Sequence, residues 1–313
     1  MAPDVYEHAP VLLGEALEGL AVRESGTYLD ATLGRGGHTA GILERLGEQG
    51  RVLAVDRDPE AIAAGQRRFS GDQRVVVVKG DFSRLGDIVR EAGFVAGFDG
   101  ILLDLGVSSP QLDDPARGFS FLRDGPLDMR MDPESGFSAA QWLDSAGEAE
   151  IARVLKEYGE ERFARRIARR IVAERGPRPF RTTGQLAAVV AEAVPKREPG
   201  KHPATRTFQA LRMLVNDEIG ALESALPAAV ALLRPAGRLC VISFHSLEDR
   251  RVKRFIRAES EVPEPWRGLP TIPPEARPRL RPVGKAIRPS VEETGRNPRA
   301  RSAVLRVAER LAA

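Results

Sequence analysis

Three closely spaced glycines are the first residues of this chain that suggest chemistry. Gly34, Gly36 and Gly37 follow a short apolar segment at residues 28–31 and precede a helical pattern. Glycine has no Cβ atom, so it adopts positive φ and lets a ligand approach the backbone closely. A strand, a glycine turn and a helix N-terminus together form the usual nucleotide site of an open α/β sheet. Because ligand-free turns also use glycine, a second signal is needed.

Acidic residues at the ends of three apolar segments supply that signal. Asp56, Asp81 and Asp104 come at or just after segments whose composition is typical of buried strands. In open parallel sheets, ligands bind outside the carboxyl ends of the strands. Asp56 lies about 20 residues past the glycines, where such folds place an acid for ribose hydroxyls. We therefore expect a ligand that carries an adenosine-like ribose.

Two classes of cofactor suit a glycine turn followed by such an acid. A dinucleotide places its pyrophosphate on the helix N-terminus, and its fingerprint ends in Gly or Ala where this chain has Thr39. A row of acids would also repel a pyrophosphate. S-adenosylmethionine has no phosphate, and its sulfonium tolerates nearby carboxylates. The electrostatic argument favours S-adenosylmethionine and leaves an NAD-linked oxidoreductase as the alternative enzyme.

Alternating strands and helices must position these side chains. The alternation stops at Pro110, helical patterns follow to about residue 204, and an apolar strand returns at 238–244 after a predicted turn at 235–237. We predict an α/β fold, an open parallel sheet with an inserted all-helical domain. Its discontinuous main domain spans 1–109 and 205–313, and the insertion spans 110–204.

Three local features of the second half of the chain are also predicted. The helical pattern of 205–233 is expected to break at Pro227, and Ser246 is expected to cap a helix at 247–258. The segment 302–307 reads as a terminal strand that enters the sheet antiparallel. Residues 263–289, rich in proline and arginine, are expected to form an extended loop.

Composition limits the classes of protein that this chain can be. Hydrophobic residues make up 42% of it, enough for a full core, and no uninterrupted apolar run is long enough to span a bilayer. Cys240 is the only cysteine, so no intramolecular disulfide forms and a reducing cytoplasm is the natural location. No histidine spacing suggests a metal site. The sequence gives no indication of an oligomeric state, and a homo-oligomer remains open.

Positive charge gathers at the C-terminal end. Residues 250–313 hold 16 Lys and Arg against 7 Asp and Glu, a net charge of +9 in a chain whose total is +3. This asymmetry predicts a polyanionic partner, with a solvated basic surface as the alternative. Phe244 and His245, followed by the Arg-rich helix, are candidates to stack an RNA base and hold phosphate. A non-enzymatic RNA-binding or assembly factor is therefore a third hypothesis.

Long stretches of the chain resemble the RsmH (MraW) family, bacterial methyltransferases that act on N4 of a decoding-site cytidine in 16S ribosomal RNA. The resemblance runs nearly end to end. It lies in DATLGRGGHT (30–39), AVDRDP (54–59), LLDLGVSSPQLDDPARGFSF (102–121), GPLDMRMD (125–132), YGEERFARRIA (158–168), KHPATRTFQALR (201–212), ISFHSLEDR (242–250) and NPRARSAVLR (297–306).

The resemblance implies a class I, Rossmann-like methyltransferase sheet with a helical, substrate-recognition domain inserted after the fourth strand. It implies that the substrate is 16S rRNA within the small ribosomal subunit, methylated at the cytidine numbered 1402 in the usual rRNA numbering. It also implies S-adenosylmethionine contacts at Gly36, Gly37, His38, Asp56, Phe82, Asp104 and Gln111. Phe82 and Gln111 come from the resemblance alone, since the strand-end pattern favours the neighbouring Asp81.

The residues also bear on which atom of the base is methylated. Methylation of a pyrimidine at carbon 5 requires a cysteine that adds covalently to the ring. Cys240 lies in the middle of a predicted buried strand, which is typical of a core residue. An exocyclic amine needs instead to be oriented and to donate its N–H groups to acceptors. Asp104 is the candidate catalytic residue, and the backbone and hydroxyls of 107–109 are the alternative acceptors.

Overall fold

The computed structural model describes residues 10–176, 178–195, 200 and 202–312. The chain divides into two compact units. The first consists of Met1–Gly106 and Gly220–Ala313, and the second consists of Val107–Ile219. The second unit is thus one continuous segment between the two halves of the first. It extends past the predicted boundary at residue 204 because Phe208 and Leu211 are buried in its core.

The first unit is built on a seven-stranded sheet within the described residues, in the order β3-β2-β1-β4-β5-β7-β6. The first five strands in this order run parallel, whereas β7 is antiparallel to both β5 and β6. This confirms the predicted α/β class and the antiparallel entry of the last strand. The strands are β1 (Thr27–Asp30), β2 (Arg51–Asp56), β3 (Val75–Lys79), β4 (Phe98–Asp104), β5 (Leu233–Ser243), β6 (Leu280–Pro282) and β7 (Val304–Arg310).

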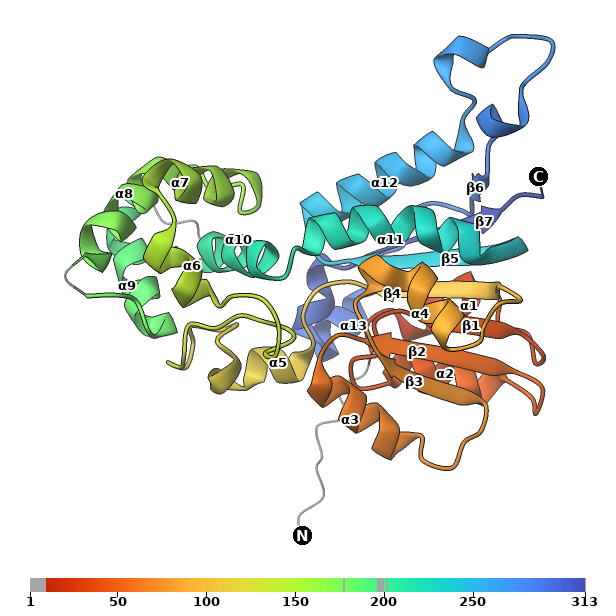
Figure 1. Ribbon diagram of the computed structural model, residues 1–313, viewed down its shortest axis with the longest axis horizontal. Coiled ribbons are helices and arrows are strands. Elements are labelled where there is room, and N and C mark those ends of the chain that lie inside the picture. The colour runs from red at the N-terminus through yellow and green to blue at the C-terminus, as the bar shows by residue number, and fades with distance from the viewer. Residues whose placement is uncertain (1–9, 177, 196–199, 201, 313) are drawn as a thin grey trace. The chain divides into compact units, whose positions relative to one another are not determined.

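Helices cover both faces of this sheet (Figure 1). On β2, for example, Val52 and Ala54 face one layer while Leu53 and Val55 face the other, and all four are buried. One layer holds α1 (Leu13–Leu20), α2 (Gly37–Arg45) and α3 (Pro59–Arg68); the other holds α4 (Leu85–Glu91), α11 (Glu218–Leu232) and α12 (Ser246–Ser260). Short helices include η1 (Phe82–Arg84), η3 (Glu264–Trp266), η4 (Pro274–Ala276), α13 (Val291–Arg296) and η5 (Pro298–Ser302).

Strands β5 and β6 differ from the sequence prediction. The predicted turn at 235–237 lies inside β5 as a bulge, because Phe98 pairs with Leu233 while Gly100 pairs with Arg238. Ala236, in that bulge, has φ 63°. Strand β6 falls in the segment expected to be a loop. It ends in Pro282 and lies at the edge of the sheet, where a residue without an N–H is tolerated.

Two helix predictions are wrong. Helix α11 continues through Pro227, and the break comes earlier, between α10 (Thr205–Val215) and Glu218, where Asp217 has φ 45°. Helix α12 begins at Ser246, and its cap is His245, whose Nδ1 accepts a hydrogen bond from the Glu248 N–H at 3.3 Å. In the described part of the chain, no helix is long and apolar enough to cross a membrane.

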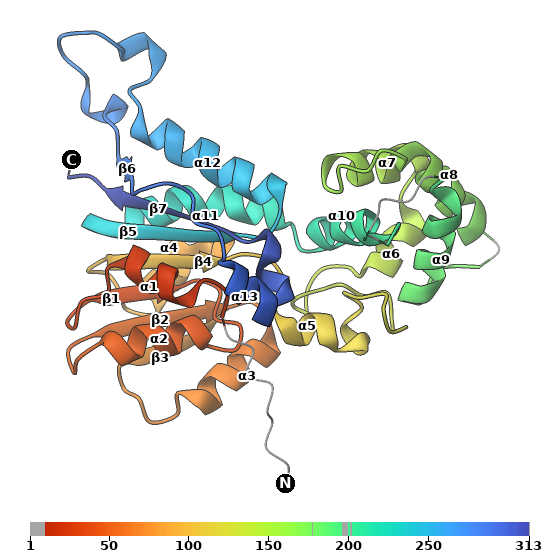
Figure 2. The same ribbon diagram turned by 180° about the vertical axis from the view of Figure 1, so that it is seen from behind.

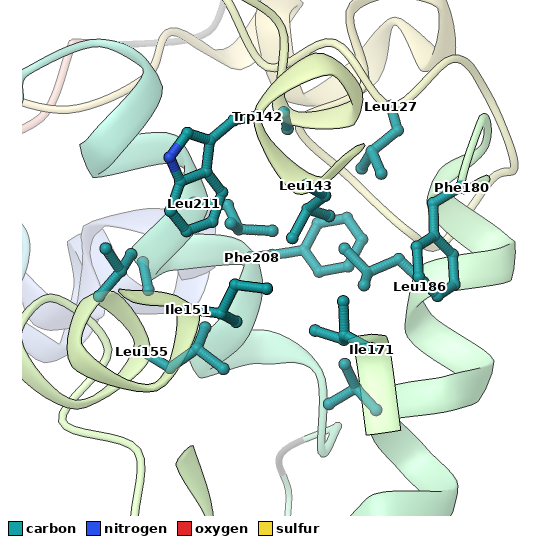
Figure 3. Packing of buried hydrophobic residues seen from close by; sticks show 14 of the residues in the cluster. Leu127, Trp142, Leu143, Ile151, Leu155, Ile171, Phe180, Leu186, Phe208 and Leu211 are labelled. Atoms are coloured by element: carbon teal, nitrogen blue, oxygen red, sulfur yellow. The ribbon is translucent and has the colours of Figure 1, made fainter. Parts of the chain in front are cut away.

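The second unit is helical. Its elements are α5 (Ser109–Asp113), η2 (Pro115–Arg117), α6 (Ala139–Ser145), α7 (Glu148–Glu157), α8 (Ala164–Arg175), α9 (Thr183–Ala193) and α10. Figure 3 shows the apolar side chains that meet between these helices, with Phe208 of α10 among residues of α6, α7, α8 and α9. Helix α8 turns its apolar side inward through Ile167 and Ile171, both fully buried.

Asn216 fixes the loop that precedes α6. Its Oδ1 accepts a hydrogen bond from the Met131 N–H at 2.7 Å, and its Nδ2 donates to the Met129 carbonyl at 2.8 Å. Met129 is fully buried and has φ 68°, a region that costs energy for a residue with a side chain. The buried amide of Asn216 therefore holds the GPLDMRMD stretch in a conformation that it would not adopt alone.

Candidate functional site

The glycine turn joins β1 to α2. Gly34 and Gly36 have φ 53° and 74°, and Gly36 is the N-cap of α2. A Cβ atom on Gly36 would lie 2.8 Å from the Phe69 ring, and one on Gly37 would lie 2.7 Å from Pro10. The backbone conformation at Gly36 and the packing at both positions therefore require glycine.

Asp56 holds this turn from the end of β2. Its Oδ2 accepts a hydrogen bond from the Gly34 N–H at 2.8 Å, and its Oδ1 accepts one from the Asp58 N–H at 2.9 Å. A carboxylate can accept about four hydrogen bonds, so both oxygens retain capacity for hydroxyl donors. Desolvation by the surrounding protein raises the pKa of Asp56 to about 6, despite the two backbone donors.

Asp30, at the end of β1, is a further strand-end acid that the sequence analysis missed. It is fully buried, and its Oδ2 accepts a hydrogen bond from the Thr39 hydroxyl at 2.7 Å. Burial raises its pKa above the ordinary value. Its position directly before the glycine turn, at the same edge as the other three acids, was the available signal.

Asp104 ends β4, the neighbour of β1 on the other side. Its N–H donates to the Thr32 hydroxyl at 2.7 Å, which ties β4 to the glycine turn. Desolvation raises the pKa of Asp104 well above its ordinary value, and the negative charges of Asp30 and Glu248 add to the effect. The carboxyl ends of β1, β2 and β4 thus hold three acids with raised pKa values.

His38 connects the first turn of α2 to Asp104. Its Nε2 donates to the Val11 carbonyl at 3.1 Å, and its Nδ1 lies 3.6 Å from Asp104 Oδ2. Since a carbonyl only accepts, the neutral ring presents an unprotonated Nδ1 to the carboxyl group. Burial lowers the pKa of His38, so the imidazole is preferentially neutral. Two unprotonated acceptors at this distance repel, which favours a proton on Asp104.

The second oxygen of Asp104 is the unsatisfied atom of the site. Oδ1 is buried and has no hydrogen-bond partner among the residues that the structure describes. A buried acceptor without a donor costs about 1–3 kcal/mol. A ligand that brings an ammonium or amino group to this oxygen would satisfy it.

The remaining predicted residues divide between the two units. Phe82 begins η1, three residues beyond the end of β3, and packs partly buried against the apolar layer that includes Leu85. The neighbouring Asp81 accepts a hydrogen bond from the Ser83 N–H at 2.8 Å and pairs with Arg57 at 2.5 Å. Its carboxylate therefore already has partners within the protein.

Gln111 lies in the second unit. It is buried, and its Oε1 accepts a hydrogen bond from the Ser108 N–H at 2.9 Å, which caps α5. The structure thus brings together the glycine turn, His38, Asp56 and Asp104, and a role for Gln111 beside them stays a prediction.

Three other residues singled out from the sequence are packed in the protein or cap a helix. Phe244 packs, partly buried, against the layer that contains α1, and His245 caps α12. Cys240 is fully buried in β5, and burial raises the pKa of its thiol far above the ordinary value. A thiol that does not ionise cannot add to a pyrimidine ring, which agrees with its interpretation as a core residue.

The chain is similar to known proteins over nearly its whole length. A family model described as the MraW methylase family matches residues 5–311. A ribosomal RNA small subunit methyltransferase H from Thioalkalivibrio sulfidiphilus is 61% identical over 306 residues, which cover 97% of this chain and 98% of the relative. The protein of the same name from Halorhodospira halophila is 57% identical over 310 residues, covering 99% and 96%. A solved rRNA methylase from Streptococcus thermophilus aligns over 95% of each chain, with 12% identity and a TM-score of 0.42.

Proposed function

The chain belongs to the MraW methylase family, and we propose that it methylates the exocyclic N4 of a cytidine in the decoding region of 16S rRNA. The cytidine is the one numbered 1402 in the usual rRNA numbering. The observation that carries this proposal is the end-to-end identity of 57–61% with relatives named as ribosomal RNA small subunit methyltransferases. The chain is a methyltransferase, and S-adenosylmethionine is its methyl donor.

The residues of the site fit this cofactor. Asp56 retains acceptor capacity for ribose hydroxyls, and the unpartnered Oδ1 of Asp104 suits an ammonium group. The backbone of the glycine turn, with His38, would lie along the amino acid end, and Phe82 would lie beside the adenine. Gln111 completes the proposed set. When bound, S-adenosylmethionine supplies a methyl group made electrophilic by its sulfonium.

The protein must also prepare the amine of the base. The lone pair of cytosine N4 is delocalised into the ring, so the amine has to be held in line with the methyl group while its N–H groups meet acceptors. Asp104 is the proposed catalytic residue because it is the acid whose position is fixed by both Thr32 and His38. The backbone and hydroxyls of 107–109 are the other acceptors in reach along the chain.

We assign recognition of the RNA partly to the helical unit. Arg162, Arg165 and Arg166 are exposed on and just before α8, and none has an ion-pair partner among the described residues. Such free guanidinium groups suit the phosphates of 16S rRNA in the small subunit. The proposed location is the cytoplasm, where this substrate is assembled.

Mapping of modified nucleotides by mass spectrometry tests the proposal directly. Small-subunit RNA from cells that lack the protein should lose one N4-methyl group at a decoding-site cytidine, and the purified protein with S-adenosylmethionine should restore it. Identical maps with and without the protein would contradict the proposal. Calorimetry with NAD and S-adenosylhomocysteine distinguishes the proposed methyltransferase from the NAD-linked oxidoreductase alternative. Cofactor binding without methyl transfer would favour a non-enzymatic assembly factor.

A further inference from the structure

A cleft lies in the first unit, away from the glycine turn, between α12 and the segment that follows β6. It has a volume of about 190 Å³. Its floor is apolar, with Ile256 on α12, Val283 after β6 and Val307 on β7. Its rim is basic and includes Lys253 and Lys285.

Ion pairs inside the protein neutralise much of the C-terminal positive charge. Arg251 pairs with Glu223 at 3.0 Å, Arg279 with Glu259 at 2.5 Å, and Arg281 with Glu309 at 2.5 Å. The 16 Lys and Arg side chains of this region therefore outnumber the cations that are available to a partner. Cations without an internal ion-pair partner are the ones that are available to bind an anion of a partner.

The two arginines that line the cleft also have acidic partners inside the protein. Arg306 forms two hydrogen bonds with Asp249, at 2.7 and 3.1 Å. Arg257 donates a hydrogen bond to Glu261 at 2.9 Å. Among the described residues that line the cleft, Glu261 is the only acid. The carboxylate of Glu261 also pairs with Arg267 at 3.4 Å, so two guanidinium groups share its single negative charge.

Lys253 and Lys285 are exposed and have no ion-pair partner in the described part of the chain. They reach the cleft from different elements, and each adds an uncompensated ammonium charge. Two like charges on one small concave surface raise the local potential and attract an anion. The apolar floor adds a surface for carbon atoms next to that anion.

The size of the cleft indicates what kind of anion it takes. Pockets for whole small ligands are typically about 300–1,000 Å³, so this one suits a part of a longer molecule. A ribose on the apolar floor with its phosphate between the two lysines has the right chemistry. RNA phosphates are the contacts that position a protein on its substrate without reading its sequence.

The position of the cleft favours RNA as the source of that phosphate. Helix α12 begins three residues after β5, whose end pairs with Asp104 of the proposed catalytic site. Lys253 lies about 10 Å along the helix from its start. Figures 1 and 2 show α12 leading from this edge of the sheet toward β6. An RNA strand that leaves the active site along α12 would meet the cleft.

We propose that the cleft between α12 and residues 282–286 binds a ribose-phosphate of the rRNA strand near the methylated nucleotide. The inference rests on the proposed function, because it takes rRNA as the substrate. It adds a contact that holds the strand by its backbone, outside the site of methyl transfer.

The test compares two double variants of the full chain that lose the same charge. Lys253→Gln with Lys285→Gln removes both lysines of the cleft. Arg45→Gln with Arg67→Gln removes two exposed cations of α2 and α3, which also lack ion-pair partners among the described residues. The probe is the small ribosomal subunit from cells lacking this protein, and its binding is measured as a function of KCl concentration. Melting temperature and S-adenosylhomocysteine affinity serve as controls of folding.

The cleft variant should bind the subunit about 25-fold more weakly at 0.1 M salt, with a log K against log salt slope smaller by about 1.4. This follows from the loss of two contacts with a single strand, at about 0.7 each. The control variant should keep the wild-type slope. An unchanged slope in the cleft variant would overturn the inference, as would equal losses in both variants. So would binding of free cytidine monophosphate that depends on the lysines while subunit binding does not.

The proposed function itself is judged separately, on the wild-type protein. If wild type binds and methylates the subunit while the cleft variant keeps the full slope, the function stands and the cleft inference fails. If wild type methylates no ribosomal RNA, the proposed function fails.

Discussion

Asp56→Asn is the substitution that most directly tests the ribose site. The carboxylate now accepts hydrogen bonds from the Gly34 and Asp58 N–H groups, at 2.8 and 2.9 Å, and is proposed to accept ribose hydroxyls as well. Asparagine has one acceptor oxygen in place of two and no negative charge. The variant should therefore lose affinity for S-adenosylhomocysteine and also weaken the glycine turn.

The size of both effects follows from these contacts. Hydrogen bonds to a charged group contribute about 1.5–3 kcal/mol, which corresponds to about 10- to 150-fold in the dissociation constant. One buried backbone N–H left without an acceptor costs about 1–3 kcal/mol in the free energy of unfolding. Asp81→Asn is the matched control, because Asp81 is a strand-end acid whose carboxylate pairs with Arg57. It should leave the affinity within about a factor of two of wild type.

The pH dependence of binding gives a sharper test. The pKa of Asp56 is raised to about 6 from 3.8, a difference worth about 3 kcal/mol. Below pH 3.8 the carboxyl group is protonated in both folded and unfolded chains, so it adds no penalty. As pH rises through 6, the folded state must carry a desolvated charge, and the stability of the unliganded protein falls. Ribose hydroxyls that donate to the ionised form reverse this penalty.

Calorimetric titrations with S-adenosylhomocysteine should therefore show affinity rising about tenfold between pH 5 and pH 7 through Asp56, because about one molecule in eleven is ionised at pH 5. Asp30, His38 and Asp104 titrate in both proteins, so the ratio of wild-type to Asp56→Asn affinity isolates the contribution of Asp56. A ratio that does not change with pH would refute the assignment of Asp56 to the ribose.

Three further substitutions test separate parts of the structure. Gly36→Ala places a Cβ 2.8 Å from the Phe69 ring at φ 74°, so denaturant unfolding should show a loss of about 1–2 kcal/mol, and calorimetry a weaker cofactor affinity. Wild-type values would contradict the strained turn. Cys240→Ala should retain methyl transfer, measured with labelled S-adenosylmethionine, and lose about 1 kcal/mol of stability; an inactive but folded variant would indicate thiol chemistry. Asn216→Ala leaves the Met131 N–H and a buried carbonyl unpaired, so the unfolding free energy should fall by about 3 kcal/mol, and a loss below about 1 kcal/mol would show that the loop holds itself.

Hydrophobic patterns predicted the parallel core of the sheet because those strands are apolar on both faces. The same patterns could not assign α10 to a unit. Its apolar stripe, which includes Phe208 and Leu211, predicts that one face of the helix is buried. The stripe does not show which neighbouring element that face packs against. The predicted helix break at Pro227 is wrong for a related reason. It is exposed on α11, and burial of Leu226 and Ala229 on either side offsets its local cost of about 3 kcal/mol.

Within the candidate site, spacing along the chain identified the glycine turn, Asp56 and Asp104. Spacing also singled out Asp56 for the ribose, but it could not show that Asp81, which follows a strand in the same way, has its carboxylate occupied within the protein. What distinguishes them is the identity of the partner: backbone amides of the glycine turn for Asp56, and the guanidinium of Arg57 for Asp81. Such contacts depend on the three-dimensional arrangement. For the same reason the link from Thr32 to Asp104 leaves no pattern in the sequence.

The raised pKa values of Asp30, Asp56 and Asp104 explain why this turn favours one class of cofactor. Each carboxylate is held where its charge is poorly solvated, and the negative charge of Asp30 adds to the cost at both Asp56 and Asp104. A pyrophosphate would add two negative charges to this surface. A ligand with an ammonium and a sulfonium brings positive charge, and on our proposal its ammonium would also satisfy the unpartnered Oδ1 of Asp104. The electrostatic energy stored in the acids thus becomes binding energy for a cationic methyl donor, and the backbone of the turn has no need to bind phosphate.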